Sequence, residues 1–317
     1  MKSYLHASGL LFNQPLLATP DTVEMAVRWA NQVMGLNIIN LPGTPGPGLY
    51  RDDDDHAAVL ARQDAQRRAV IESTGVEVIP VHGLLVSRGA HMNVCETMTS
   101  YEGLRNDLRR AVSDPKVERI VLDIDSAGGA ATGAFELASD LRALSLQKPI
   151  TGIVNFQAFS GGYLIGAACT ELVVSRTSGV GSIGVIAKHM DRSAMEERMG
   201  LKVTTVSAGA HKNDLSPHEP LTEQSLQYLQ GLVNEGYAMF VDAVAEYRGL
   251  SPDAVRATEA GVFRGQAAIA LGLADRLEAP TDALDNITRA VAVARSSRPS
   301  GSRLAIRAAA AAAQVQL

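Results

Sequence analysis

From Val76 to about Leu277, short apolar runs that suit β-strands alternate with amphipathic segments that suit helices, and this alternation restricts the fold more than any other feature. The run ERIVLDID is mostly apolar, as is typical of a strand that is covered on both faces. The helix-like segment TGAFELASDLRAL follows it, and PITGIVN is the next strand-like run. Strands and helices that alternate at this spacing predict an α/β fold with a largely parallel sheet.

Local signals place several element boundaries within this region. VEVIPVHG is a predicted strand that Gly83 ends, and Thr99 with Glu102 forms a capping box that opens a helix running to about Val112. SAGGA is a predicted tight turn, and LKVTTVS a predicted strand. A long amphipathic helix is expected from Leu221 to about Tyr247.

The chain is expected to have three parts. Residues 1–75 form an N-terminal helical arm with a linker rich in Pro, Gly and Asp, and nothing in their sequence indicates chemistry. Residues 76–280 form the main domain, and residues 281–317 a flexible C-terminal tail. The chain of 317 residues is long enough for a large buried core.

Composition excludes some classes of protein. Apolar residues make up 46% of the chain and charged residues 20%, as in ordinary globular proteins. The net charge of -5 gives no reason to expect nucleic acid as a partner. No apolar run reaches the length of a membrane span. Cys95 and Cys169 match no metal or redox spacing and are expected to be buried thiols.

The segment FQAFSGGYLI places Ser160 between an aromatic residue and two glycines, at the start of a helix-like run. A serine in this position is either an N-cap or a nucleophile. The nucleophile elbow of α/β-hydrolases has the pattern G-x-S-x-G, and Ala158 stands in place of its first glycine. The match is therefore partial, and both interpretations stay open at this point.

A serine nucleophile needs a base, and the chain offers histidines and lysines. The downstream histidines are His189, His211 and His218, none with a distinctive flank. Among the lysines, Lys212 in SAGAHKND follows a predicted strand, and Lys188 follows the apolar GVIA. A lysine that acts as a base near neutral pH must lose about 3 pKa units, or about 4 kcal/mol, and burial can supply that change.

Two glycine pairs follow predicted strands, at the edge of a parallel sheet where ligands bind. They are Gly128-Gly129 and Gly161-Gly162. Without a Cβ, such residues can direct backbone amides at a ligand oxygen, which is what a tetrahedral oxyanion requires. Each pair could equally be a tight turn between a strand and a helix.

Four segments occur in the order DIDSAGGAATGAFELA, QAFSGGYLIGAAC, TSGVGSIGVIAKHMD and VSAGAHKNDLSP. They resemble the signal-peptide-peptidase A family of Ser-Lys peptidases, and most closely its phage branch, the lambda-type capsid protein C or head maturation proteases. The resemblance covers roughly residues 75–278 and includes TEAGVFRGQAAIALGLADRL. It implies a Clp-protease/crotonase-like fold, a stack of β-β-α units.

The resemblance also implies roles for single residues. Ser160 matches the family nucleophile in its Ser-Gly-Gly motif, and Lys212, 52 positions later, matches the general base. Ser182 in GSIG matches the hydroxyl that holds the lysine amine in place.

The resemblance also implies an oxyanion hole. Gly128 matches its donor, with Gly129 beside it and the Gly161 amide nearby. Ala127 stands where the family has proline, which removes some rigidity from the turn but no donor.

The implied function is a serine endopeptidase that processes capsid, scaffold or portal proteins during phage head assembly, in the host cytoplasm or the procapsid interior. The family forms rings, so a homo-oligomer is expected, and the chemistry requires no metal or cofactor. The Ala-rich segment 308–313 is a candidate for self-cleavage.

Several alternatives remain open. One is a bacterial cytoplasmic peptidase related to signal peptide peptidase, and another is a non-enzymatic capsid assembly protein that retains the fold. A Clp-like triad would use His189 or His211 in place of Lys212. A crotonase-type enzyme would bind coenzyme A and would not need Ser160.

Overall fold

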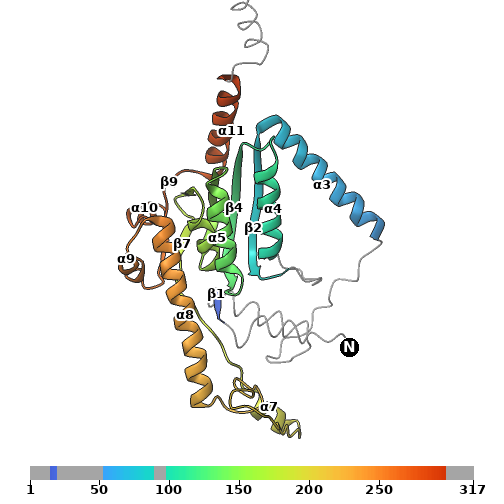
Figure 1. Cartoon of the computed structure of the whole chain (residues 1–317), viewed down its shortest axis with the longest axis vertical. Helices are drawn as coiled ribbons and strands as arrows, with labels where there is room; N and C mark the ends of the chain where they lie inside the picture. Colours follow the sequence, from blue (N-terminus) through green and yellow to red (C-terminus); the bar gives the residue numbers. More distant parts are fainter. Residues whose placement is uncertain (1–14, 20–52, 89–97, 298–317) are drawn as a thin grey trace, which may run out of the picture.

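A computed structural model describes residues 15–19, 53–88 and 98–297 of the chain (Figure 1). One sheet contains strands β1 (Leu16–Ala18), β2 (Val76–Val86), β3 (Met98–Ser100), β4 (Arg119–Ala130), β5 (Ile150–Phe159), β6 (Glu171–Val174), β7 (Gly179–Gly181), β8 (Val262–Arg264) and β9 (Arg276–Leu277). The helices are α3 (Asp53–Thr74), α4 (Tyr101–Ser113), α5 (Ala134–Ser145), α6 (Gly161–Ala167), α7 (Ser193–Arg198), α8 (Glu223–Arg248), α9 (Pro252–Arg256), α10 (Gln266–Ala270) and α11 (Pro280–Ser297).

The sheet is mostly parallel, as the sequence predicts. Its strand order is β3-β2-β4-β5-β6-β9, and every neighbouring pair along this path is parallel. The antiparallel pairs among the described residues are β1 with β4 and β7 with β8. The predicted α/β class is therefore confirmed.

The long strands are each divided into two segments, which gives the predicted β-β-α order. The register of β2 against β4 shifts between His82 and Leu84, and that of β4 against β5 shifts between Ile124 and Ser126. Strand β5 pairs first with β6 and then, through residues 157–159, with β7. Helix α5 follows β4 and helix α6 follows β5, whereas β3 lies between β2 and helix α4. The later segments of β2, β4 and β5 lie at the carboxyl end of the sheet.

Helices cover both faces of the sheet. Successive residues of a strand point to opposite faces. Ile120 and Leu122 of β4 belong to the main core, with α4, α5, α6 and α8. Val121 points the other way, into a second cluster under α11. The β-strands under these helices are buried on both sides, which explains their apolar runs.

Helix α11 differs from the predicted flexible tail. It covers residues 280–297 and packs on β2, β4, β5 and β6. Its Ala283 and Val291 are buried against Val76, Val121, Ile153 and Val173. Residues 280–297 therefore pack with the main domain, because their apolar face covers the second side of the sheet.

Three local predictions are wrong for identifiable reasons. SAGGA is no turn, because β4 continues through it to Ala130 with a neighbouring strand on each side. LKVTTVS forms no strand and is exposed throughout. The N-cap of α4 is Ser100, whose hydroxyl accepts the Gly103 amide at 3.0 Å, while the Thr99 hydroxyl bonds to the backbone of His82.

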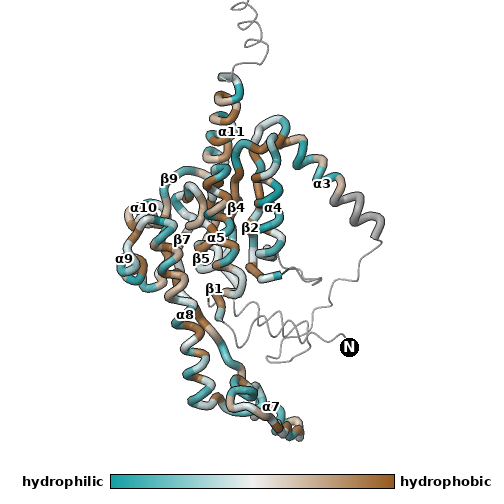
Figure 2. Tube along the Cα trace, in the orientation of Figure 1, coloured by the Kyte–Doolittle hydropathy of each residue, from teal (hydrophilic) through white to brown (hydrophobic). Residues whose placement is uncertain are grey.

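Residues 190–222, which include α7, form a projection together with the start of α8. The projection extends beyond the sheet at the lower end of Figure 1. Figure 2 shows hydrophobic residues among those of the projection. Met199, Leu201, Val203 and Val206 are exposed by 65%, 55%, 46% and 94% of their surface. Exposed apolar side chains that gather in this way are typical of an interaction surface.

Among the described residues, no helix has both the length and the apolar composition needed to cross a membrane. Most of the predicted arm and linker, Cys95 and the Ala-rich segment 308–313 lie outside the described residues. Cys169 is buried as predicted, and this burial raises the pKa of its thiol to about 12.

An ion pair ties the end of α8 to the edge of the sheet. Arg248 donates to both carboxylate oxygens of Asp275 at 2.8 and 2.9 Å, and the amide of Leu172 in β6 donates to the same carboxylate at 2.7 Å. Partial burial acts to raise the pKa of Asp275, but these hydrogen bonds outweigh it and the pKa is lowered. A lowered pKa stabilises the folded state above the unfolded pKa, near 3.9, and this contribution is lost as pH falls through the folded pKa.

We therefore expect Asp275→Asn to lower the free energy of unfolding by about 1–2 kcal/mol at pH 7, since the carboxylate is only partly shielded from water. The difference from the wild type should shrink below about pH 4, where the carboxylate of the unfolded chain takes up a proton, and should vanish once the pH falls below the lowered folded pKa. Urea unfolding at pH 7, 5 and 3 measures both effects. Asp253→Asn is the control, because Asp253 is 97% exposed and should show no difference at any pH. An equal loss at pH 7 and pH 3 would contradict the electrostatic explanation.

Candidate active site

Ser160 lies where β5 ends and α6 begins, at the carboxyl end of the sheet. Its backbone has φ 51° and ψ -117°, a conformation that non-glycine residues rarely adopt. The Ser160 amide donates to the Gly181 carbonyl at 2.9 Å, and its hydroxyl lies 3.4 Å from the Gly184 carbonyl. The residue is 0% exposed. Strained backbone of this kind is concentrated at functional sites, where surrounding contacts hold it in place.

The two glycine pairs of the sequence meet beside Ser160. Gly128 has φ 99°, and a Cβ on it would lie only 2.9 Å from the Gly161 nitrogen. A Cβ on Gly162 would lie 2.8 Å from the Ser126 carbonyl oxygen. The chain therefore uses glycine at these positions to let the end of β4 approach the start of α6. Gly129 allows a second close approach, since its Cβ would lie 1.9 Å from the Leu85 carbonyl oxygen.

Two amides near Ser160 are candidates to polarise a substrate carbonyl. Gly161 is the first residue of α6, and the first amides of a helix have no acceptor within it. The Gly128 amide donates to the Ser126 hydroxyl at 3.1 Å, and that hydroxyl donates to the Gly83 carbonyl at 2.6 Å. The Gly161 amide is thus ready to bind an oxyanion, whereas the Gly128 amide would first have to exchange its Ser126 bond.

Ser182 lies in the loop that contacts Ser160. Its neighbours Gly181 and Gly184 supply the two carbonyls that bond to the serine. The Ser182 backbone also has a positive φ, 54°, and its amide donates to the Gly261 carbonyl at 2.8 Å. The structure therefore brings together Ser160, Gly128, Gly161 and Ser182.

Lys212 is not part of this cluster. Its side chain is exposed on the projection, in the turn over residues 210–215. Gln224, at the start of α8, holds this turn by donating to the Ala210 carbonyl at 3.0 Å. Gly236 packs on Val185, next to the Ser160 loop. Gln224 and Gly236 are twelve residues apart on α8, or about 18 Å at 1.5 Å per residue, which is more than a lysine side chain spans.

Two of the candidate histidines, His211 and His218, pair with carboxylates on the same projection. The His211 Nδ1 is 2.8 Å from an Asp214 oxygen, and the His218 Nδ1 is 2.8 Å from a Glu196 oxygen. His189 and Lys188 are partly exposed, at the start of the projection. No hydrogen bond found among the described residues joins any of these side chains to Ser160.

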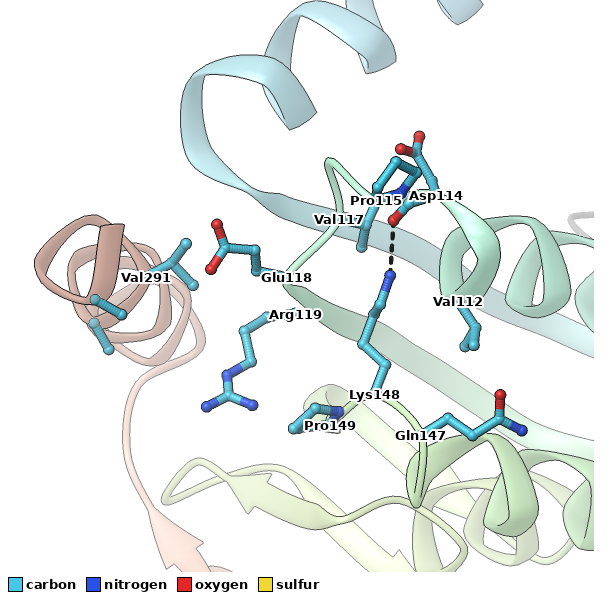
Figure 3. Close-up of a pocket in the computed structure, with 12 residues that line it drawn as sticks. Val112, Asp114, Pro115, Val117, Glu118, Arg119, Gln147, Lys148, Pro149 and Val291 are labelled. Carbon is cyan, nitrogen blue, oxygen red and sulfur yellow. Dashed lines mark hydrogen bonds between the residues drawn. The ribbon is translucent and has the colours of Figure 1, made fainter. Parts of the chain in front are cut away.

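A hollow at the opposite end of the sheet contains another lysine (Figure 3). Lys148 donates to the carbonyls of Ala111 and Asp114 at 2.9 and 2.8 Å, and burial lowers its pKa. The ten residues of β5 separate Lys148 from Ser160, roughly 30 Å at 3.3 Å per residue. Lys148 therefore binds the carbonyls at the end of α4 and is too far away to serve Ser160.

One element of the site, strand β1, has no signal in the sequence. Residues 1–75 carry no chemical signal, yet β1 within them lies directly beside Gly128, with the register Ala18 to Gly128 and Leu17 to Gly129. A three-residue strand has too few residues to show a period, so no pattern in the sequence could have identified it.

The chain is similar to a known peptidase family and to two phage proteins. The model of peptidase family S49 matches residues 142–294. The chain is 36% identical over 290 residues to the head-tail preconnector protein GP5 of Enterobacteria phage P21, across 90% of this chain and 57% of that protein. It is 33% identical over 307 residues to the capsid assembly protease C of Escherichia phage lambda, across 96% of this chain and 70% of that protein.

Solved structures with a similar chain course include a membrane protease from Pyrococcus horikoshii that is specific for a stomatin homolog. It is 13% identical with a TM-score of 0.40, and the alignment covers 66% of this chain and 76% of that one. A mutant ClpP1 from Listeria monocytogenes is 10% identical, also with a TM-score of 0.40, over 68% of this chain and 98% of that one. Because a relative at 33% identity is covered across 70% of its length, and a family model matches the Ser160 region, the chain belongs to peptidase family S49.

Proposed function

We propose that the chain is a serine endopeptidase in which Ser160 is the nucleophile. The observation that carries this proposal is the convergence of Ser160 with Gly128 and Gly161 at the carboxyl end of the sheet. Family membership and the strained Ser160 backbone support it. An N-cap role is not supported, since the Ser160 side chain makes no capping hydrogen bond to α6.

In the proposed reaction, the Ser160 oxygen attacks the carbonyl carbon of a peptide bond, and the hydroxyl proton passes to a base. The carbonyl oxygen becomes an oxyanion that the Gly161 amide binds, joined by the Gly128 amide once it leaves the Ser126 hydroxyl. The base returns its proton to the leaving amine, and the resulting acyl-enzyme is hydrolysed by water.

The proposed base is Lys212, and its position adds a requirement. An amine in water has a pKa near 10.4 and is protonated at neutral pH, so it cannot accept the serine proton. Lys212 is exposed on the projection, about 18 Å along α8 from the Ser160 loop. For Lys212 to act, another surface must cover the projection and bring the amine to a Ser160 hydroxyl.

We propose that this surface belongs to a second copy of the chain. The apolar residues on the same projection support a covered interface, which would supply both the desolvation and the approach. Ser182, in the loop beside Ser160, would then orient the incoming amine. The active form is accordingly a homo-oligomer in which one copy donates its projection to the next.

The proposed substrates are capsid, scaffold or portal proteins of a phage head, processed in the host cytoplasm or inside the procapsid. The support is similarity to proteins named a head-tail preconnector and a capsid assembly protease. Because the chain spans 57% and 70% of those two proteins, the activity and substrates of the whole protein belong to the proposal.

Labelling with a fluorophosphonate probe tests the proposed function. We expect a single covalent adduct on Ser160, located by peptide mass spectrometry, because the probe requires an activated serine. The fraction labelled per minute should rise with protein concentration in parallel with the oligomer fraction measured by light scattering. Labelling that is independent of assembly would contradict a base supplied by a second copy, and the absence of an adduct at every concentration would contradict the peptidase.

A further inference from the structure

Strand β1 fills a slot between two backbone edges beside Ser160. On one side, Leu16, Leu17 and Ala18 pair antiparallel with Ala130, Gly129 and Gly128. On the other side, Leu16 and Ile186 exchange both main-chain hydrogen bonds, at 2.7 and 3.1 Å. The strand is thus held on both edges by main-chain bonds, as a peptide is when it adds to an open sheet.

The Leu17 carbonyl oxygen lies close to both glycines of the candidate oxyanion hole. A Cβ on Gly128 would lie 1.9 Å from the Leu17 oxygen, and a Cβ on Gly161 would lie 3.2 Å from the same oxygen. These are the two glycines whose amides are the candidate oxyanion donors. The carbonyl therefore lies between the end of β4 and the start of α6, beside the proposed nucleophile.

The side chains of β1 fill the slot as well as its backbone does. Leu17 is 0% exposed and joins the main core, while Leu16 and Ala18 pack on Ile186 on the other face. Ser160, which immediately precedes Gly161 in the chain, is 0% exposed. A second peptide cannot reach the serine while β1 is in place, because both backbone edges and the space between them are occupied.

The strand is short enough to be displaced. Its described length is three residues, and Pro15 precedes it and Pro20 follows it in the sequence. Proline has no amide to donate, so the ladder cannot lengthen evenly in either direction. Beyond the strand, the flanking bonds to β4 are the Thr19 amide to the Ala127 carbonyl and the Ala131 amide to the Pro15 carbonyl, at 3.2 and 3.4 Å.

We propose that Leu16–Ala18 is an internal occupant of the peptide-binding groove of Ser160, and that it must leave before a substrate peptide can bind. This inference rests on the proposed function, because it takes Ser160 as the nucleophile. The groove itself accepts an extended peptide, antiparallel to β4, with an aliphatic side chain at the Leu17 position and a small one at the Ala18 position. The chain covers its own site until β1 is released.

A disulfide between β1 and the opposite edge of the groove tests the inference. Hydrogen-bonded antiparallel residues have Cα atoms about 5.5 Å apart, within the range that a disulfide spans. Leu16→Cys with Ile186→Cys should therefore form a bond that keeps β1 in place, in a Cys95→Ser background. We expect the oxidised protein to label with fluorophosphonate at Ser160 at least about tenfold more slowly than the reduced protein, because only the open fraction reacts.

The two single-cysteine variants are the controls, and each should label equally with and without oxidant. Equal labelling of the oxidised and reduced double variant would overturn the inference while leaving the proposed nucleophile intact. If the reduced double variant and the wild type both fail to label, the proposed function fails, and the inference with it.

A second variant tests release from the other direction. Leu17→Asp places a charge in a fully buried position, so it favours the state in which β1 is in water. We expect labelling of Ser160 to accelerate, and a synthetic peptide of residues 13–21 to slow it again by binding the vacated groove. A folded Leu17→Asp protein that labels no faster than the wild type would show that β1 is a permanent part of the fold, and would overturn the inference.

Discussion

Replacement of Ser160 by alanine is expected to lower kcat for peptide cleavage by about 10⁵- to 10⁶-fold, the loss found when a serine peptidase loses its nucleophile. The residue sits where β5 turns into α6 and where the Gly128 and Gly161 segments meet, so no other hydroxyl can take over its position. The fold should survive, because the substitution removes one oxygen whose bond to Gly184 is long, at 3.4 Å. Hydrolysis of a fluorogenic peptide, measured at concentrations where the protein is assembled, gives the ratio.

Ser178→Ala is the matched control. Ser178 is also a fully buried serine, but its hydroxyl accepts the Ser175 amide at 2.7 Å in the loop after β6 and does not contact the site. We expect about 1 kcal/mol of lost stability and no change in kcat beyond about twofold. If Ser160→Ala retained wild-type turnover, Ser160 would be a structural residue, and a crotonase-type chemistry that uses only the glycine amides would become the better explanation.

The sequence predicted the sheet well because its strands carry strong signals. Strands β4 and β5 are apolar on both faces, and the structure covers them with α5, α6 and α11. The glycine pairs also indicated where the candidate site lies, because the close approach of β4 to α6 leaves no room for a Cβ at Gly128. What the sequence could not show is that the Gly128 segment continues as a strand, since a partner far away in the chain, β1, provides half of the pairing.

The failed strand prediction over residues 201–207 has a related cause. Alternating residues such as Leu201 and Val203 are typical of a strand with one buried face, but nothing in the described chain covers them. A local sequence pattern indicates which face of a strand should be buried. It does not indicate whether the surface that covers that face belongs to the same chain. The same limit applies to Lys212, whose identity as a candidate base was available from the sequence but whose distance from Ser160 depends on the 26-residue length of α8.

Replacement of Lys212 by alanine is expected to lower kcat by about 10³- to 10⁴-fold, because the Ser160 proton then has no acceptor in the site. Lys202→Ala is the matched control, since Lys202 is an exposed lysine on the same projection. It should leave kcat unchanged. If Lys212→Ala were as active as the wild type, the base would have to be one of the histidines, and His189→Ala or His211→Ala should then abolish turnover.

Mixing the two inactive variants decides which copy supplies the amine. In an assembly where each projection reaches the next copy, a working site needs Ser160 from a Lys212→Ala chain and Lys212 from a Ser160→Ala chain. Random mixing at equal amounts forms that pairing in about one quarter of the sites, so about one quarter of the wild-type activity should return. An amine that reaches the serine of its own chain predicts no recovery at any ratio, because no single chain then holds both groups. Recovery thus separates a site completed by a neighbour from one completed by a movement of α8. The exposed apolar residues on the same projection as Lys212 favour the neighbour.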